Sequence, residues 1–322
     1  MNAIVVKCHG GPECLAFEDR PIPQLGPSGR ALVRIAAVGV NFVDVYQRMG
    51  KYAGTLPFVA GSEGSGVVEA VSQDVAALKP GDRVAFCDVR GGYANYVLAP
   101  AERLVRVPPG VDDRTAAAVM LQGITAHYLS RSTYQIRSGD VVLVHAGAGG
   151  VGLLLTQMAH LAGARVITTV STDHKAALSR DAGADDVILY TTQDFAAETL
   201  RLTGGAGVNA VYDSVGKTTF EKGLEVIRRR GMMVSFGQSS GNAPAIDPLR
   251  LVKGSLYLTR PTIADYIAST KELRERADDV FGMVERGELH VRIGHVYALR
   301  DAAQAHRELE ARKTTGKLLL IP

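Results

Sequence analysis

The sequence predicts an α/β fold in which a doubly wound parallel sheet is joined to a second, β-rich domain. The first observation is an alternation of strand-like and helix-like segments between residues 141 and 259. Its strand-like segments are residues 141–144, 165–170, 187–189, 210–212, 232–235 and 255–259. The second observation is that short apolar runs separated by turn residues fill the chain up to about residue 110, which is typical of antiparallel β structure.

The β-rich part begins near the N-terminus, and we expect the C-terminal tail to complete it. Its strand-like segments are residues 4–6, 31–38, 66–71 and 83–86. A helix-rich section follows from Asp113, and the tail contains a helix at residues 301–310 and an apolar strand within residues 316–322. Because a last strand needs a sheet to join, we expect it to return to the β-rich part.

A glycine-rich turn follows the first strand of the alternation. Gly147, Gly149 and Gly152 form a G-x-G-x-x-G pattern directly after a Val-rich strand, and the apolar residues 153–162 are typical of a helix. We expect Gly147 to allow the tight turn, Gly149 to let the backbone approach a pyrophosphate, and Gly152 to let helix and strand pack closely. The first N–H groups of such a helix bind phosphate. The turn therefore predicts a dinucleotide-binding domain.

The same region carries no charged residue from Val141 to Ala164, a length that would also span a bilayer. Five glycines and the polar residues His145, Gln157 and His160 within this run favour a buried strand and helix instead. We therefore expect no membrane-spanning segment.

The residues after the second strand indicate which dinucleotide is bound. NAD-preferring sites usually place Asp or Glu about 20 residues after the first glycine, where it accepts a hydrogen bond from the ribose 2′-hydroxyl. Here Ser171 and Thr172 come first and Lys175 follows one helical turn later, and these groups suit a 2′-phosphate. Asp173 leaves NAD open as an alternative, and Lys175 is also compatible with a solvated lysine. The pattern favours NADPH.

Composition limits the classes of function. A chain of 322 residues, 46% of them hydrophobic, is long for a single core and predicts two domains. The net charge of +3 comes from Lys and Arg scattered among nearly as many Asp and Glu, which disfavours a nucleic-acid-binding stripe. The densest basic run, residues 228–230, is typical of a solvated helix end.

The cysteines and the N-terminus predict a cytoplasmic protein. Cys8, Cys14 and Cys87 form no pattern of a disulfide framework or a metal site. The first residues show neither the apolar core of an export signal nor an Arg-rich presequence.

Six ordered motifs extend the interpretation to a known family. They are residues 9–13, 39–44, 61–68, 79–84, 145–152 and 211–216. Over nearly its whole length the chain resembles the medium-chain dehydrogenase/reductase superfamily, and within it the zeta-crystallin-like quinone oxidoreductases. Residues 229–237 and 254–261 resemble the bacterial NADPH quinone reductases in particular.

The resemblance implies two domains and a reaction. A GroES-like catalytic domain comprises residues 1–123 completed by 264–322, and an NADPH-binding Rossmann domain comprises residues 124–263. The implied reaction is hydride transfer from NADPH to a quinone or a conjugated enone. Zinc-dependent members carry Cys and His where this chain has Asn41 and Ser62, so Glu63 is the one candidate zinc ligand that remains in these motifs. The four-cysteine lobe that holds a structural zinc in those members is missing from the sequence as well. Because catalytic zinc needs three protein ligands, we expect no metal.

Without a metal, hydrogen-bond donors near the carbonyl oxygen of the acceptor must stabilise its developing charge. Asn41, Tyr46 and Tyr52 are the candidate catalytic residues, because they cluster where the zinc-dependent members keep their chemistry. Tyr46 and Tyr52 are also compatible with packing or lid aromatics, and Asn41 and Asp44 with ordering their loop.

The resemblance also implies cofactor contacts at positions that match the family's motifs. These are Phe42, Asp44, Tyr46, Tyr128, Gly147, Gly149, Gly150, Val151, Gly152, Ser171, Thr172, Lys175, Tyr190, Val215, Phe236, Ser239, Arg260 and Lys317. Arg260 and Lys317 are equally compatible with surface or interface cations. His145, which precedes the glycine turn, is expected to be structural.

Two classes of function remain open from the sequence. The first is an NADPH-dependent reductase, and the second is a cofactor-binding protein with a structural or RNA-binding role, as in crystallin-like relatives. The weak basic excess disfavours RNA. The expected partners are a small-molecule quinone or enone and a second copy of the chain, paired through the exposed edge of strand 255–259 in a homodimer. No nucleic acid or membrane partner is expected.

Overall fold

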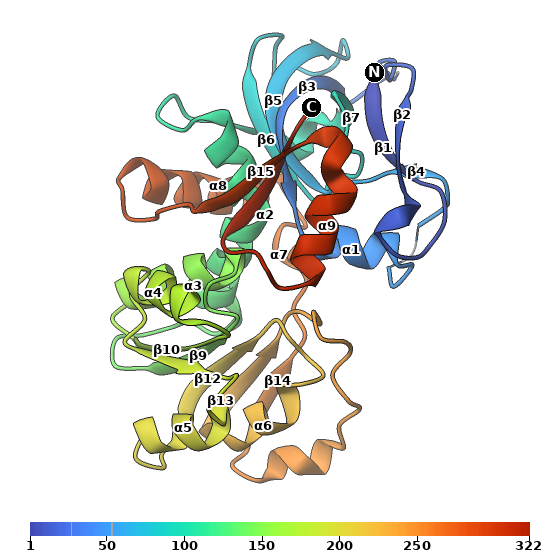
Figure 1. Cartoon of the computed structure of the whole chain (residues 1–322). Coiled ribbons are helices and arrows are strands. Elements are labelled where there is room, and N and C mark those ends of the chain that lie inside the picture. Colours follow the sequence, from blue (N-terminus) through green and yellow to red (C-terminus); the bar gives the residue numbers. More distant parts are fainter. Residues whose placement is uncertain (27, 53) are drawn as a thin grey trace. The chain divides into compact units, whose positions relative to one another are not determined.

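The computed structural model describes residues 1–26, 28–52 and 54–322, which divide into two compact units. The β-rich unit comprises Met1–Ile124 and Ile267–Pro322, and the six-stranded unit comprises Thr125–Tyr266. Figure 1 colours the first unit from blue to green and from orange to red, and the second unit from green to orange. In the part of the chain that the structure describes, no helix is long and apolar enough to cross a membrane.

Two sheets form the framework of the β-rich unit. The larger has the strand order β15-β16-β3-β5-β6-β8, with β7 paired to β3, and the smaller has the order β2-β1-β4. The strands are β1 Asn2–Val6, β2 Leu15–Asp19, β3 Arg30–Val40, β4 Phe58–Val59, β5 Glu63–Val71, β6 Arg83–Cys87, β7 Tyr96–Pro100, β8 Val105–Arg106, β15 Ile293–Ala298 and β16 Lys317–Ile321. The helices are α1 Phe42–Arg48, α8 Thr270–Glu285 and α9 Ala302–Glu310, and α2 Asp113–Tyr128 begins in this unit.

The C-terminal strand returns to the β-rich unit, as the sequence predicts. β16 pairs antiparallel with β3, with Leu319 opposite Gly39. Leu318 and Leu320 of β16 pack in the same core as Val33 and Val38 of β3. The tail therefore completes the larger sheet and brings its residues beside α1 and β5.

The six-stranded unit contains a parallel sheet of order β11-β10-β9-β12-β13-β14. Its strands are β9 Val141–His145, β10 Arg165–Val170, β11 Asp186–Leu189, β12 Val208–Asp213, β13 Ile227–Ser235 and β14 Tyr257–Thr259. Its helices are α3 Gly150–Leu161, α4 Asp173–Asp181, α5 Phe195–Leu202, α6 Phe220–Glu225 and α7 Ile263–Tyr266. This is the doubly wound Rossmann order, with the first strand in the middle of the sheet.

Helices cover both faces of this sheet, which explains the continuous apolar runs of its strands. Right-handed crossovers place α3 and α4 on one face and α5 and α6 on the other (Figure 1). All six residues of β12 are consequently buried.

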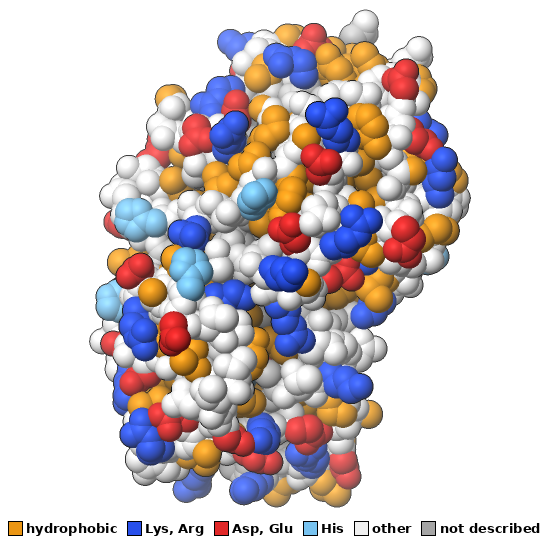
Figure 2. All heavy atoms as spheres, viewed as in Figure 1, with side chains coloured by type: hydrophobic (Ala, Val, Ile, Leu, Met, Phe, Trp, Pro, Cys, Tyr) orange, Lys and Arg blue, Asp and Glu red, His pale blue; other side chains and the backbone are white. Residues whose placement is uncertain are grey.

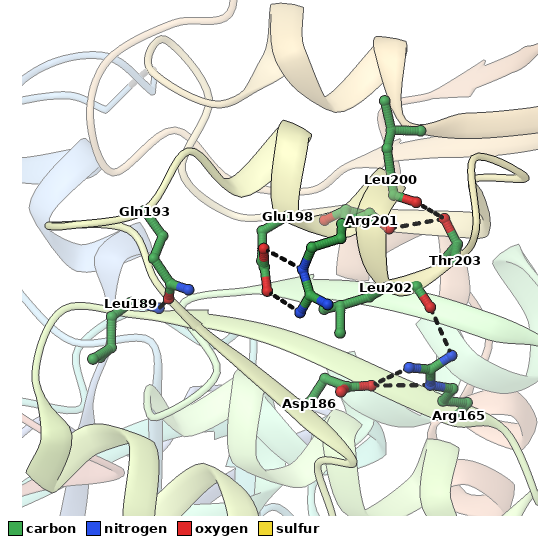
Figure 3. A network of polar contacts seen from close by, with 10 residues as sticks. Arg165, Asp186, Leu189, Gln193, Glu198, Leu200, Arg201, Leu202 and Thr203 are labelled. Carbon is green, nitrogen blue, oxygen red and sulfur yellow. Dashed lines mark hydrogen bonds and ion pairs between the residues drawn. The ribbon is translucent and has the colours of Figure 1, made fainter.

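Polar contacts join the amino-terminal ends of β10 and β11 to each other and to the end of α5 (Figure 3). Arg165, the first residue of β10, pairs with Asp186, the first residue of β11, at 2.7 Å, and donates to the carbonyl of Leu202 at the end of α5. Glu198 and Arg201 form an ion pair within α5. These contacts lie at the opposite end of the strands from the glycine turn, so we assign them a structural role.

The basic run Arg228 to Arg230 does not end a helix, contrary to the sequence prediction. It lies within β13, and the preceding helix α6 already ends at Glu225. The pairing of β13 with β12 jumps from Val208 opposite Ile227 to Ala210 opposite Met232. The residues from Arg228 to Gly231 therefore form a bulge in the sheet, and the three arginines are exposed to solvent.

Candidate active site

The predicted cofactor residues of the six-stranded unit lie where its strands end. The glycine turn follows β9, Ser171 follows β10, Tyr190 follows β11, Val215 follows β12, Phe236 follows β13, and Arg260 follows β14. Because parallel strands end at the same edge of a sheet, the fold gathers these residues at the carboxyl edge. Doubly wound sheets bind their ligands at this edge.

Gly152 is required by close packing between α3 and the turn. A Cβ at this position would lie 2.3 Å from the carbonyl oxygen of Ala146. The helix begins at Gly150, and its N-cap residue Gly149 provides no side-chain hydrogen bond to the first turn. The N-terminus of α3 is therefore suited to an anion such as a pyrophosphate.

Gly147 has a different role in the turn from the one predicted. The left-handed residue is Ala146, with φ of 55°. A Cβ on Gly147 would lie 2.6 Å from the Cβ of Thr168 and 2.8 Å from the Oγ of Ser179. Gly147 is therefore needed because β10 and α4 pass close to the turn, and not because the turn requires a positive φ there.

Ser171, Thr172, Lys175 and Tyr190 lie together beside the ends of β10 and β11. Thr172 caps α4, its Oγ1 accepting a hydrogen bond from the Lys175 backbone N–H at 3.3 Å. The Tyr190 N–H donates to the carbonyl of Val170, and the tyrosine side chain is 40% exposed. The arrangement combines hydroxyl groups and one cation, as a phosphate site requires.

Asp213 organises the loops that carry Val215, Phe236 and Ser239. Its Oδ1 accepts from the Val215 N–H at 2.7 Å, and its backbone carbonyl accepts from the Phe236 N–H at 2.8 Å. Ser239 N–H donates to the carbonyl of Ser214. The ends of β12 and β13 are thereby held side by side.

The remaining predicted residues of this unit have polar or aromatic partners. Arg260 donates through Nη1 to the carbonyl of Ser235 at 3.0 Å. Tyr128 is buried and stacks on Tyr266, with ring centroids 4.2 Å apart and planes at 7°. His145 is also buried, its Nδ1 lies 2.9 Å from the Oγ1 of Thr169, and burial lowers its pKa. His145 is therefore a neutral structural residue, as expected.

In the β-rich unit, helix α1 brings the candidate tyrosines together. The rings of Tyr46 and Tyr52 meet edge to face with centroids 5.6 Å apart, and the ring of Phe42 lies 6.0 Å from that of Tyr46. Tyr46 is 6% exposed, whereas Tyr52 is 39% exposed. The pair forms an aromatic cluster with one side chain open to solvent.

Asn41, which precedes α1, is held in a buried ion-pair cluster. Its Nδ2 donates to Glu63 Oε2 at 2.7 Å, and its Oδ1 accepts from Lys317 Nζ at 2.8 Å. Lys317 also pairs directly with Glu63, both side chains being inaccessible to solvent. Gln122 donates to Asn41 and the Leu121 N–H to Glu63. Burial lowers the pKa of Lys317, and the neighbouring Glu63 carboxylate opposes that shift.

Asp44 occupies the first turn of α1. Its Oδ2 accepts from the Asn41 N–H at 2.9 Å and from the Tyr93 hydroxyl at 3.1 Å. Burial raises the pKa of its carboxyl to about 6. The side chain thus orders the start of α1 from inside the unit.

Comparisons with known proteins decide the family. Residues 27–109 match a model described as an alcohol dehydrogenase GroES-like domain, and residues 150–280 match one described as a zinc-binding dehydrogenase. The chain is 45% identical over 317 residues to the quinone oxidoreductase of Pseudomonas aeruginosa, covering 98% of this chain and 97% of that protein. The chain belongs to the quinone oxidoreductase family.

Two further relatives illustrate the range of this family. A 2-haloacrylate reductase of a Burkholderia species is 40% identical over 332 residues, covering 99% of this chain and 98% of that protein. The crystal structure of the Escherichia coli quinone oxidoreductase complexed with NADPH is 39% identical, has a TM-score of 0.97, and matches all of both chains. The fold is accordingly the Rossmann and GroES-like combination that the sequence predicts.

The residues at the zinc positions do not fit a catalytic zinc ion. Asn41 and Ser62 offer neutral side chains, and Ser62 Oγ donates to Gln47. The carboxylate of Glu63, next to Ser62, is bound by the Lys317 ammonium, whose charge repels a divalent cation. Across residues 1–26, 28–52 and 54–322, no group of three or more His, Cys, Asp or Glu side chains is placed to hold a metal.

Sequence reasoning missed the buried partners of the predicted residues. Tyr93, Gln122 and His306 contact α1 or its N-cap directly or through one another. They belong to segments far from α1 in the chain, and nothing in their local pattern marks them. The sequence analysis named Glu63 only as the carboxylate left at the zinc positions, and did not reveal its buried partners.

Proposed function

We propose that this member of the family is a zinc-independent, NADPH-dependent reductase of quinones or conjugated enones. The observation that carries the proposal is the carboxyl edge of the six-stranded sheet, where the glycine turn and the phosphate-suited residues after β10 lie together. The names of the family members, quinone oxidoreductase and 2-haloacrylate reductase, support reduction of conjugated acceptors. The NADPH complex of the Escherichia coli protein supports the choice of cofactor.

The proposed cofactor contacts follow the geometry of the edge. The N-terminus of α3, with Gly149 to Gly152, binds the pyrophosphate, and Ser171, Thr172, Lys175 and Tyr190 bind the 2′-phosphate. The other proposed contacts are Phe42, Asp44, Tyr46, Tyr128, Gly147, Val215, Phe236, Ser239, Arg260 and Lys317. Lys317 is buried with Glu63 and also donates a hydrogen bond to Asn41, the residue that precedes α1. NADPH, when bound, supplies the hydride.

The proposed catalytic residues are those of the α1 region. The hydroxyl groups of Tyr46 and Tyr52 donate to the carbonyl oxygen of the acceptor, which stabilises the negative charge that develops there. Conjugated acceptors need only such donors, because their charge spreads over an enolate or an aromatic ring. Both hydrogens of the Asn41 amide are engaged by Glu63 and Gly39, so Asn41 acts as a positioning group.

The structural or RNA-binding alternative has less support. On the face seen in Figure 2, Lys and Arg side chains are interspersed with Asp and Glu, and no continuous stripe of Lys and Arg crosses it. The relatives described above are named quinone oxidoreductase and 2-haloacrylate reductase, which are names of enzymes.

We propose a homodimer formed through β14, an edge strand that begins with the exposed Tyr257 (58%) and follows the exposed Leu249 and Val252 (74% and 72%) in the chain. We also propose a cytoplasmic location, which the three free cysteines support.

Tyrosine variants test the catalytic assignment. If one hydroxyl stabilises the developing charge, its Tyr→Phe variant loses about tenfold to a thousandfold in turnover of a simple quinone, with NADPH affinity little changed. Steady-state kinetics of Tyr46→Phe, Tyr52→Phe and the double variant measure this. Tyr96→Phe, in β7, is the control, and full activity in the double variant would contradict the assignment.

A further inference from the structure

A chain of buried side chains connects the two ends of helix α1. Arg48 Nη1 lies 3.1 Å from His306 Nδ1, His306 Nε2 lies 3.1 Å from the Tyr93 hydroxyl, and that hydroxyl lies 3.1 Å from Asp44 Oδ2. None of the four side chains is more than 2% exposed. We call these four residues the α1 clamp. Asp44 and Arg48 belong to α1, His306 to α9, and Tyr93 to the segment between β6 and β7.

The donors and acceptors of the α1 clamp have a single consistent direction. A guanidinium only donates, so His306 Nδ1 must accept from Arg48. The proton of the neutral ring is then on Nε2, which donates to the Tyr93 oxygen, and the Tyr93 hydroxyl donates to Asp44.

The electrostatic environment keeps this direction fixed. Burial, with the charge of Arg48 beside the ring, lowers the pKa of His306 to about 3. Burial and the neighbouring Asp44 raise the pKa of Tyr93 well above its usual value. His306 therefore stays neutral and Tyr93 stays protonated near neutral pH, and the alternative tautomer would break the bond to Arg48.

Further contacts hold each end of α1. At the N-terminal end, Asp44 accepts from the Asn41 N–H. At the C-terminal end, Arg48 donates through Nε to the carbonyl of Gly10 at 3.0 Å and pairs with Glu310 at 2.8 Å. A helix of seven residues has little stability of its own, so these tertiary contacts determine where it lies.

We propose that His306 is a positioning residue, which fixes both ends of α1 through Arg48 and Tyr93 and thereby sets the place of Tyr46. The inference rests on the proposed function, because it gives His306 an effect on turnover through Tyr46, which lies between the two anchored residues of the helix. His306 does not contact the reacting atoms in this account.

The first test reads the state of the His306 ring directly. Histidine-selective ¹⁵N labelling and NMR are applied to the wild type, and the His306→Gln variant identifies the signal. We expect a neutral ring with its proton on Nε2 from about pH 8 down to about pH 5. Titration of this ring near the usual histidine pKa, or the opposite tautomer, would overturn the α1 clamp.

The second test measures hydrogen exchange of residues 42–48 by mass spectrometry. His306→Ala removes both bonds, Tyr93→Phe removes one hydroxyl, and His306→Gln keeps an acceptor and a donor. We expect exchange to accelerate about tenfold or more in His306→Ala and Tyr93→Phe, and to stay near wild type in His306→Gln. His295→Gln, an exposed histidine on β15, is the matched control. Unchanged exchange in Tyr93→Phe and in folded His306→Ala would overturn the proposal.

The third test connects position to turnover. We expect His306→Ala or, if that variant does not fold, Tyr93→Phe to lower quinone kcat by up to about a hundredfold, and His306→Gln to restore kcat. Faster exchange with unchanged kcat would overturn the positioning role. Absence of quinone turnover in the wild type would instead refute the proposed function, and the NMR and exchange results would still decide whether the α1 clamp holds the helix.

Discussion

Two lysines, Lys317 in the β-rich unit and Lys175 in the six-stranded unit, lie in different environments and have different roles. Lys317 is buried beside the α1 N-cap, and its positive charge is matched by the carboxylate of Glu63. Removing one partner of such a pair leaves a buried charge, at a cost of about 3–5 kcal/mol. Lys175 lies in the first turn of α4, where a 2′-phosphate is proposed to bind. The first cation maintains the site, whereas the second is proposed to select the cofactor.

The Lys175→Ala variant tests whether this single residue selects NADPH over NADH. Losing a charge-assisted bond to the 2′-phosphate should cost about 1.5–3 kcal/mol, which lowers NADPH affinity about tenfold or more. NADH lacks this phosphate, so its affinity should not change. Titration calorimetry with both cofactors measures the difference, and Arg180→Ala, which removes a cation from the far end of the same helix, is the control. Equal losses for both cofactors, or a wild-type preference for NADH, would contradict the assignment.

Residues with a local signature were predictable, and residues that act through distant partners were not. The glycine turn and the polar residues after β10 carry their chemistry in a few consecutive positions. His306 and Arg48 are 258 positions apart in the chain, so their contact exists only in the fold. Lys317 and Glu63 are 254 positions apart, so for the same reason the sequence did not reveal that Lys317 neutralises the Glu63 carboxylate.

Among the elements, the central strands and the edge strands β11 and β14 were predicted, whereas the edge strands β2 and β15 were missed. β9, β10 and β12 are buried along almost their whole length, because helices cover both faces of their sheet. β2 and β15 lie at the edges of their sheets, and most of their residues are exposed or half-buried. An edge strand with little burial lacks the alternation by which strands are recognised.

The packing of α3 against the glycine turn gives a prediction at the scale of elements. In Gly152→Ala the new methyl group meets the Ala146 carbonyl, so α3 must move away from the turn. We expect a loss of about 1–3 kcal/mol in the free energy of unfolding and weaker NADPH binding. Urea unfolding and cofactor titration measure the two effects. Gly282→Ala in α8, where the nearest atom belongs to the flexible side chain of Arg286, is the matched control, and equal stability of the two variants would contradict the packing argument.

For the whole molecule, the exposed β14 edge leads to a prediction about assembly. An unpaired edge strand beside large exposed apolar side chains favours association with a second copy of the chain. We expect light scattering at micromolar concentration to give twice the mass of one 34.2 kDa chain. Tyr257→Lys should shift the equilibrium toward the monomer, whereas Phe17→Lys, an exposed aromatic residue on β2, should not. A single-chain mass for the wild type would refute the dimer.

We propose that NADPH-dependent reduction of a conjugated acceptor needs no metal in this protein, since Asn41, Ser62 and the Glu63–Lys317 pair occupy the zinc positions. The most direct measurement is NADPH oxidation with a simple quinone before chelation, after exhaustive chelation, and after zinc is added back. We expect the same rate of NADPH oxidation in all three states, and little activity with saturated alcohols in any of these states. Activity that disappears with the chelator and returns with zinc would contradict it.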